Sequence, residues 1–299
     1  MKTPSRYRGR FAPTPSGPLH FGSLVTALAS WLDARTHGGE WLVRMDDLDP
    51  PREQPGAADQ ILRQLDACGL HWDGPVHYQS QRHDSYRAAV DQLMRNHQAF
   101  YCPLSRSELS ALGGKHPGSS VAASTAANNA IRLVVADSEG DSQICFDDRF
   151  VGRHCDNLNE QDGAFVIVRR DGLYAYQLAC ALDDANDCIT DVVRGSDLLA
   201  STSRQICVLN ALSRNLPRYG HLPLVTDNDG YKLAKSNSSA AIDVQHSQPA
   251  LRQALIWLGG PVIDGNIQDI LDGGMHWWRD GAIGLRHQDA GPAPEQSLP

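Results

Sequence analysis

Lysine is scarce in this chain, and long apolar runs are absent from it. Only four of the 27 basic residues are lysines. No apolar stretch approaches the roughly 18 residues that a membrane-spanning helix needs, and the start lacks the apolar core of a signal peptide. We therefore expect a protein with no membrane partner.

The seven cysteines are odd in number and scattered along 299 residues. A small secreted domain held together by disulfides has an even set at closer spacing. We therefore expect reduced thiols and a cytosolic location. The length allows one large domain or two modest ones with a substantial core.

The formal net charge of −8 argues mildly against a protein that coats nucleic acid broadly. A nucleotide pocket needs only local positive charge, and a tRNA needs only a basic stripe. Candidates for such a stripe, each equally typical of a solvated surface, are Arg149, Arg153, Arg169, Arg170, Arg204, Arg214 and Arg218.

Two distant segments are each suited to a phosphate. Lys232 and Lys235 stand three residues apart in KLAKS (232–236), and their ammonium groups act as point charges on a polyphosphate. Far upstream, the Pro/Gly-rich loop 13–23 runs into an apolar, helix-forming stretch at 23–34. Such a loop presents free N–H groups and the positive end of the helix dipole to an anion. Alone, each segment is more typical of a surface turn or a solvated face; together they indicate nucleotide chemistry at phosphorus.

Alternating strands and helices are predicted on both sides of an irregular middle region. This pattern is typical of a parallel α/β sheet with a nucleotide at the carboxyl ends of its strands. Residues 1–100 form the first half of the nucleotide-binding fold, with a strand at 41–44 and helices at 57–67 and 82–94. Residues 101–163 form an inserted subdomain, with a loop at 119–129 and strands at 130–135 and 142–146. Residues 164–236 are predicted to form the second half, with a strand at 164–168 and helices at 174–182 and 201–212. Residues 237–299 are predicted to form a short helical C-terminal region, with a helix at 249–258 and a tail.

The two phosphate-binding segments resemble the HIGH and KMSKS elements of class I aminoacyl-tRNA synthetases. Residues 10–17, 72–75 and 79–82 are similar to glutamyl- and glutaminyl-tRNA synthetases. Residues 44–52, which contain Asp-Pro-Pro-Arg, and residues 193–198 resemble one group of small paralogues, the glutamyl-queuosine tRNA(Asp) synthetases, which lack the anticodon-binding domain. Cys180 stands where full-length enzymes usually carry Asn. The resemblance covers residues 6–260 and implies a Rossmann-like class I catalytic core.

This resemblance implies a ligase that activates L-glutamate with ATP as glutamyl-adenylate and releases pyrophosphate. The glutamate would then pass to queuosine in the anticodon of tRNA(Asp). A truncated glutamyl-tRNA synthetase that charges a tRNA 3′ end, or a non-catalytic paralogue that binds glutamate or tRNA, remains an alternative. We expect a monomer, with Mg²⁺ arriving on ATP and keeping much of its water shell.

The resemblance also implies the site residues, and the chemistry of glutamate suits them. Arg10 and Arg194 can bind carboxylates bidentately, Tyr176 can reach the side-chain end, and Asp46 can receive the ammonium, directly or through water. A structural ion pair for either arginine and a core position for Tyr176 stay open. We interpret Asp183-Asp184 as a cap or anchor for the following turn. The expected catalytic residues are His20, Lys232 and Lys235; those for ATP are Pro18, His20, Gly22, Ser23 and Lys235; those for glutamate are Arg10, Phe11, Ala12, Pro13, Thr14, Asp46, Tyr176 and Arg194.

Many similar proteins hold zinc in the inserted subdomain. The corresponding positions here read Cys102, Leu104, His116 and Ser120. Leu104 cannot bind a metal and Ser120 is a poor zinc ligand. We therefore predict that zinc is absent and that apolar packing around Leu104 replaces it.

Overall fold

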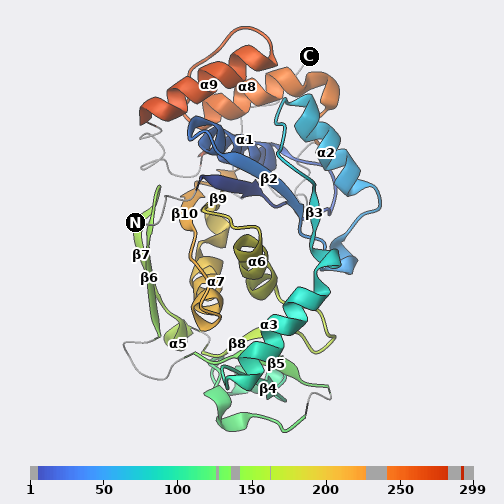
Figure 1. Cartoon of the computed structure of the whole chain (residues 1–299), viewed down its shortest axis with the longest axis vertical. Coiled ribbons are helices and arrows are strands. Elements are labelled where there is room, and N and C mark those ends of the chain that lie inside the picture. Colours follow the sequence, from blue (N-terminus) through green and yellow to red (C-terminus); the bar gives the residue numbers. More distant parts are fainter. Residues whose placement is uncertain are drawn as a thin grey trace.

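A parallel sheet forms the centre of the molecule (Figure 1). The computed structural model describes residues 6–125, 128–135, 142–161, 163–226, 241–281 and 291–292. Strands β1 (Arg8–Phe11), β2 (Glu40–Met45) and β3 (His77–Tyr78) pair in parallel, and β9 (Asp191–Gly195) pairs in parallel with β10 (Arg218–Leu222). Thr190 N–H donates to the carbonyl of Arg8 at 2.9 Å, which places β9 beside β1. Strands from both halves of the chain thus lie side by side in this parallel arrangement.

Helices cover both faces of this sheet. In Figure 1, α1 (Phe21–Thr36), α8 (Ser247–Trp257) and α9 (Ile267–Gly281) lie on one side, with α6 (Tyr176–Asn186) and α7 (Leu199–Ala211) on the other. Helix α1 buries ten residues between Leu24 and Ala34 because α8 and α9 cover the side that the sheet leaves open. The flanking helix α2 (Ala57–Ala67) instead buries a single stripe, which includes Ile61 and Leu65.

A second, antiparallel sheet lies at the opposite end from α8 and α9. It contains β4 (Ala99–Cys102), β5 (Ala130–Leu133) and β8 (Phe165–Val168), and α3 (His83–Arg95) leads into it. Short helices α4 (Arg106–Ala111) and α5 (Leu158–Gln161) adjoin it. The sequence assigns β8 to the second half of the catalytic fold, yet β8 pairs with β5. An apolar run of four residues marks a strand but not its partner, so the expected boundaries of the insertion, 101–163, fall within or beside strands of one sheet.

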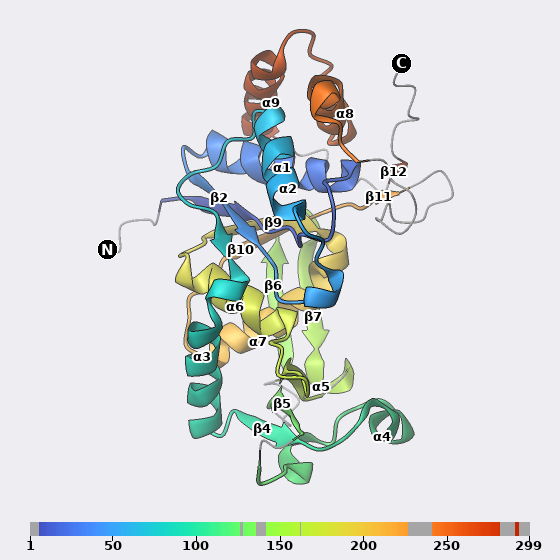
Figure 2. The same ribbon diagram turned by 90° about the vertical axis from the view of Figure 1, so that its right-hand side faces the viewer.

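A long hairpin of β6 (Gln143–Asp148) and β7 (Gly152–Asn157) runs from the antiparallel sheet to β10 (Figure 2). Its register places Cys145 opposite Cys155, and the two form a disulfide. The prediction of reduced thiols was wrong for this pair, because strand register is not visible in the spacing of cysteines. The other five, Cys68, Cys102, Cys180, Cys188 and Cys207, are free thiols.

Helix α9 was not predicted, since adjacent glycines at 273 and 274 lower helix propensity. In the fold both glycines allow close packing: a Cβ at Gly273 would overlap Ile263, and one at Gly274 would crowd Leu32 and Leu255. Strand β11 (Val225–Thr226) pairs in parallel with β12 (Gly291–Pro292). None of the helices described is both long and apolar enough to cross a membrane.

Candidate active site

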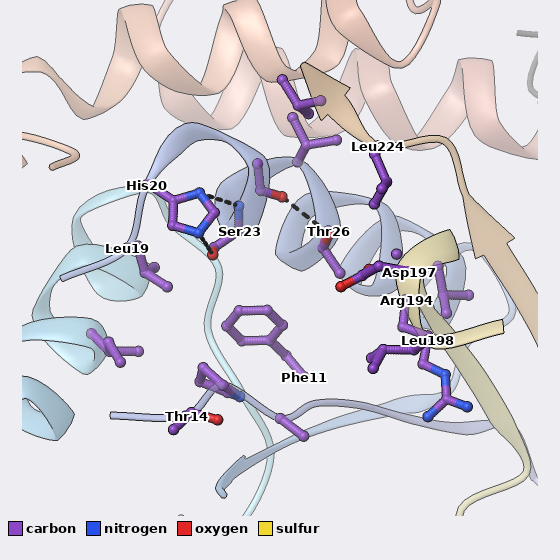
Figure 3. Close-up of a pocket in the computed structure, with 18 of the residues that line it drawn as sticks. Phe11, Thr14, Leu19, His20, Ser23, Thr26, Arg194, Asp197, Leu198 and Leu224 are labelled. Atoms are coloured by element: carbon purple, nitrogen blue, oxygen red, sulfur yellow. Dashed lines mark hydrogen bonds between the residues drawn. The ribbon is translucent and has the colours of Figure 1, made fainter. Parts of the chain in front are cut away.

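A cavity of about 630 Å³ opens at the carboxyl ends of β1, β9 and β10, beside the start of α1 (Figure 3). This edge is where open α/β sheets bind their ligands. Most of the predicted site residues line the cavity; they are Arg10, Phe11, Ala12, Pro13, Thr14, His20, Gly22, Ser23, Tyr176 and Arg194. Pro18 and Asp46 do not line it. The sheet thus brings together residues from both ends of the sequence.

The amino terminus of α1 points into this cavity through Gly22, Ser23 and Thr26. His20 precedes the helix as its cap: its Nδ1 accepts the N–H of Ser23 at 3.4 Å, and its Nε2 lies 3.0 Å from Ser23 Oγ. Gly17 has a φ of 130°, which favours glycine and lets the loop turn into the helix. The first helical turn can therefore bind an anion by its dipole and backbone N–H groups.

Lys232 and Lys235 lie outside the described residues, but the chain on either side of 227–240 is fixed at the cavity. On the upstream side, Val225 lines it. On the downstream side, Ala241 forms a β-bridge with His20, and Ile242 N–H donates to the carbonyl of Leu19 at 2.9 Å. The described residues on both sides of 227–240 thus lie beside the His20 loop and the start of α1.

Arg10 reaches the cavity from β1 while α6 holds it from behind. Its Nε and Nη2 donate to the two carboxylate oxygens of Asp184 at 3.1 and 3.2 Å. Arg44 donates to the same carboxylate at 2.7 Å. Burial alone would raise the pKa of Asp184, but Arg10 and Arg44 lower it to about 2. This ion pair uses two nitrogens of Arg10 and fixes its guanidinium plane at the cavity wall.

Asp183 and Asp184 lie inside α6 with both side chains fully or almost fully buried. Asp183 accepts hydrogen bonds from Gln79 and Tyr86 at 2.8 Å and from Arg82 at 3.1 Å. The interpretation of this pair as a cap or anchor for the following turn was wrong. Their carboxylates instead neutralise arginines that come from other elements.

Asp46 is also engaged, since its Oδ1 accepts from Arg44 Nε at 2.8 Å. Burial raises the pKa of Asp46, and Arg44 opposes this rise. The Asp46 N–H donates to the carbonyl of Pro13 at 2.9 Å, which ties it to the cavity loop. A role for Asp46 in receiving the ammonium group of the ligand stays a prediction. Because Asp46 does not line the cavity, such a contact would need a bridging water.

Arg194 lies on the far side of the cavity from His20 (Figure 3), and Tyr176 contacts it. Arg194 is 3% exposed, and its Nη1 donates to the Tyr176 hydroxyl at 3.4 Å. Burial raises the pKa of Tyr176, so its hydroxyl keeps its proton. A permanently charged guanidinium and a phenol donor therefore face one space, as a carboxylate ligand requires.

Comparison with known proteins agrees with this geometry. Residues 6–258 match the family described as "tRNA synthetases class I (E and Q), catalytic domain". The chain belongs to this family. The fold and the family resemblance predicted from the sequence are thereby confirmed.

Relatives in this class I synthetase family share about half of their residues with the chain. A "Glutamyl-Q tRNA(Asp) synthetase" from Pseudomonas putida KT2440 is 52% identical over 258 residues, which are 86% of this chain and 85% of that protein. One of the same name from Pseudomonas paraeruginosa PA7 is 47% identical over 299 residues, covering 98% and 99%. Among solved structures, a glutamate tRNA ligase from Elizabethkingia meningosepticum in complex with its amino acid has a TM-score of 0.79 at 23% identity, covering 96% of this chain and 67% of that one. This last likeness concerns the fold.

Some residues that line the cavity were not predicted from the sequence as site residues, among them Asp197 and Arg52. Asp197 lies in the run 193–198 that carries the resemblance, and it folds over Gly195 so closely that a Cβ there would contact its carboxylate. Arg52 comes from the Asp-Pro-Pro-Arg motif and pairs with Asp49 at 2.6 Å. Both motifs contributed to the family resemblance, but their sequences do not show which of their side chains point into the cavity.

Arg149, one of the residues proposed for a basic stripe, has a different role. Its Nη2 donates to the fully buried Asp33 at 2.7 Å, and its Nη1 donates to the same carboxylate. Trp278 of α9 donates to Asp33 as well, at 3.0 Å. Arg149 therefore joins the β6–β7 hairpin to α1 and α9.

At the four positions where many similar proteins bind zinc, the side chains make other contacts. His116 Nδ1 accepts the Gly118 N–H at 3.1 Å, which places the ring proton on Nε2, 3.1 Å from Cys102 Sγ. Burial, with Arg132, lowers the pKa of His116 to about 4. Leu104 packs against the apolar cluster that contains Cys102, and the exposed Ser120 donates to the carbonyl of Pro117. Within the described parts of the chain, no group of three or more His, Cys, Asp or Glu side chains could hold a metal.

We predict that protein purified without added metal contains less than about 0.1 zinc per chain, because two donors do not close a tetrahedral site. Elemental analysis by plasma mass spectrometry measures this content. One zinc per chain would contradict the prediction. The double variant Leu104→Cys, Ser120→Cys is the matched control: it supplies the missing thiolates and is expected to take up zinc.

Proposed function

We propose that this chain activates L-glutamate with ATP and transfers the glutamyl group to queuosine in the anticodon of tRNA(Asp). The observation that carries the proposal is one cavity lined by the start of α1, by Val225 just before the lysine segment, and by Arg10 and Arg194. Ala241, just after that segment, pairs with His20 of the same cavity. One side is suited to a polyphosphate and the other to a dicarboxylic amino acid. No element of the site needs to supply a nucleophile.

In the first step, a carboxylate oxygen of glutamate attacks the α-phosphorus, and the bond to the β-phosphate oxygen breaks to release pyrophosphate. Such a reaction depends on alignment and on neutralising charge that develops at the phosphates. The first turn of α1 and His20 would hold the triphosphate, and Lys235, with help from Lys232, would neutralise the leaving group. Mg²⁺ that arrives with ATP would shield the phosphate charges.

Glutamate would lie against the opposite wall. Arg10 uses Nε and Nη2 for Asp184, so its Nη1 would meet one carboxylate. Arg194, which is buried, and Tyr176, whose raised pKa keeps the hydroxyl protonated, would meet the other. This arrangement would place the reacting carboxylate between the two walls, as in-line attack requires.

In the second step, a hydroxyl of the acceptor attacks the glutamyl carbonyl, loses its proton, and AMP leaves. The choice of queuosine rests on the relatives named glutamyl-Q tRNA(Asp) synthetases, of which the chain matches 85% and 99% of the length. The glutamate tRNA ligase is matched over 67% of its length, which is consistent with a further region in that protein. We also infer a monomer in the cytosol; light scattering after gel filtration tests the first of these.

The test is ATP–pyrophosphate exchange without tRNA, measured across the twenty amino acids. Exchange should depend on glutamate and be at least about 100-fold slower with glutamine, since a site built for charged carboxylate contacts rejects a neutral isostere. Exchange with no amino-acid dependence would contradict activation. Glutamylation is then compared on tRNA(Asp) with and without queuosine, and equal labelling of both would refute the base acceptor.

A further inference from the structure

Behind the cavity wall, a buried aspartate and histidine stand in line with Arg194. His221, on β10, places its Nδ1 2.6 Å from the Asp148 carboxylate, at the end of β6. Its Nε2 lies 3.1 Å from Arg194 Nε. The side chains of His221 and Asp148 are completely buried. Neither residue lines the cavity, so neither can touch a ligand there.

The protons in this line have a fixed direction. Asp148 Oδ1 accepts the backbone N–H groups of Phe150, Val151 and His221 at 3.0 to 3.1 Å. Burial alone would raise the pKa of Asp148, but the hydrogen bonds from the His221 ring and from these N–H groups lower it to about 2. Asp148 is therefore a carboxylate that only accepts, so His221 carries its proton on Nδ1 and offers the Nε2 lone pair to Arg194.

His221 stays neutral in this setting. Burial lowers its pKa, and Arg194 lowers it further although Asp148 acts in the opposite direction. The Nε2 atom of a neutral ring can accept the hydrogen bond from Arg194 Nε–H. In a protonated ring Nε2 would carry a hydrogen of its own and would face the Arg194 N–H without an acceptor. The line Asp148–His221–Arg194 is thus consistent in both hydrogen bonding and charge.

The remaining contacts of Arg194 complete its orientation. Its Nη2 donates to Thr202 Oγ1 at 2.7 Å and to Gln205 Oε1 at 2.8 Å, both on α7. With Nε directed at His221, only the Nη1 edge is left on the cavity side, beside the Tyr176 hydroxyl. A flexible side chain is thereby held in one pose before a ligand arrives, which lowers the ordering cost of binding.

We propose that His221, held by Asp148, is a positioning residue that presents the Nη1 edge of Arg194 to a carboxylate of the amino-acid substrate. The inference rests on the proposed function for the identity of that substrate. It assigns His221 an effect on the amino-acid half of the site and none on the ATP half, because the line ends at Arg194 and not at α1.

Two substitutions separate the Asp148 contact at Nδ1 of His221 from the contacts at Nε2, where Thr202 Oγ1 also lies at 3.0 Å. His221→Asn keeps a donor near Nδ1 for Asp148 but has no acceptor at the Nε2 position. His221→Gln places an amide oxygen near Nε2 for Arg194 but leaves Asp148 without its donor. In exchange assays, His221→Asn is expected to raise the KM for glutamate about 10-fold or more, with kcat and the KM for ATP within about threefold. His221→Gln should keep the KM for glutamate within about threefold although it lowers the Tm more.

A purely structural role predicts the reverse order, with the less stable variant also the weaker binder. A KM for glutamate in His221→Asn equal to that of the wild type overturns the inference, as does an equal rise in the KM values for glutamate and ATP. Both results require glutamate-dependent exchange in the wild type, so they leave the proposed function intact. Wild-type protein without glutamate-dependent exchange would overturn both.

Discussion

Replacing Asp184 with alanine is expected to lower the free energy of unfolding by about 3–5 kcal/mol, because the change leaves two buried guanidinium groups short of a carboxylate. Arg10 and Arg44 both donate to Asp184, and they are 4% and 1% exposed. Arg44 is shut off from the cavity, and Arg10 meets it only at one edge, so water can compensate little. The loss is a large share of the roughly 5–15 kcal/mol that stabilises a typical domain. Urea unfolding followed by tryptophan fluorescence measures it.

A matched substitution of a surface aspartate separates the effect of losing a buried ion pair on stability from the effect of losing a charge alone. Asp147 pairs with Arg153 at 3.9 Å, and both side chains are more than two-thirds exposed. Asp147→Ala is expected to change stability by no more than about 0.5 kcal/mol. Asp184→Asn keeps the volume and one acceptor, so it should fold and report instead on Arg10, with a raised KM for glutamate. Equal stability of Asp184→Ala and Asp147→Ala would contradict the role of the buried cluster.

The sequence predicted the local elements well, because their signals are local. The pattern at residues 57–67 repeats apolar side chains at helical spacing, and α2 spans that range. Pairing over long distances had no such signal. Neither the partner of β8 nor the opposition of Cys145 and Cys155 follows from the residues themselves, since both depend on strand register.

The same division applies to the site. His20, Tyr176 and Arg194 were predicted together because a resemblance covers all three, and one cavity contains them. Asp184 and His221 were missed because their roles arise only when α6 and β10 pack against β1 and β9. A signal did exist for Asp184: two adjacent acids in the helix interrupt an apolar run, while arginines interrupt two neighbouring strands. Charges buried on packed elements must find partners of opposite sign.

The second large effect is expected at Lys235. Lys235→Ala should reduce kcat of glutamate-dependent exchange by about 10²–10³-fold, with the KM for glutamate within about threefold. In the proposed mechanism its ammonium acts mainly on charge that appears as pyrophosphate leaves. The fixed flanks of its segment support this, since Val225 lines the cavity and Ala241 pairs with His20. In the proposed mechanism, the Lys235 ammonium acts on the phosphate side of the cavity and not on the glutamate wall.

Lys115→Ala is the control for loss of a lysine, because Lys115 is exposed in the inserted region, far from the cavity in the chain. It should leave both constants unchanged. Lys232→Ala should give a smaller fall in kcat than Lys235→Ala, as expected of an assisting charge. A Lys235→Ala variant that loses glutamate affinity while its kcat stays constant would place this lysine in ground-state binding of the amino acid. The division of the cavity into a phosphate side and a carboxylate side would then be wrong, since the two walls could not be perturbed independently.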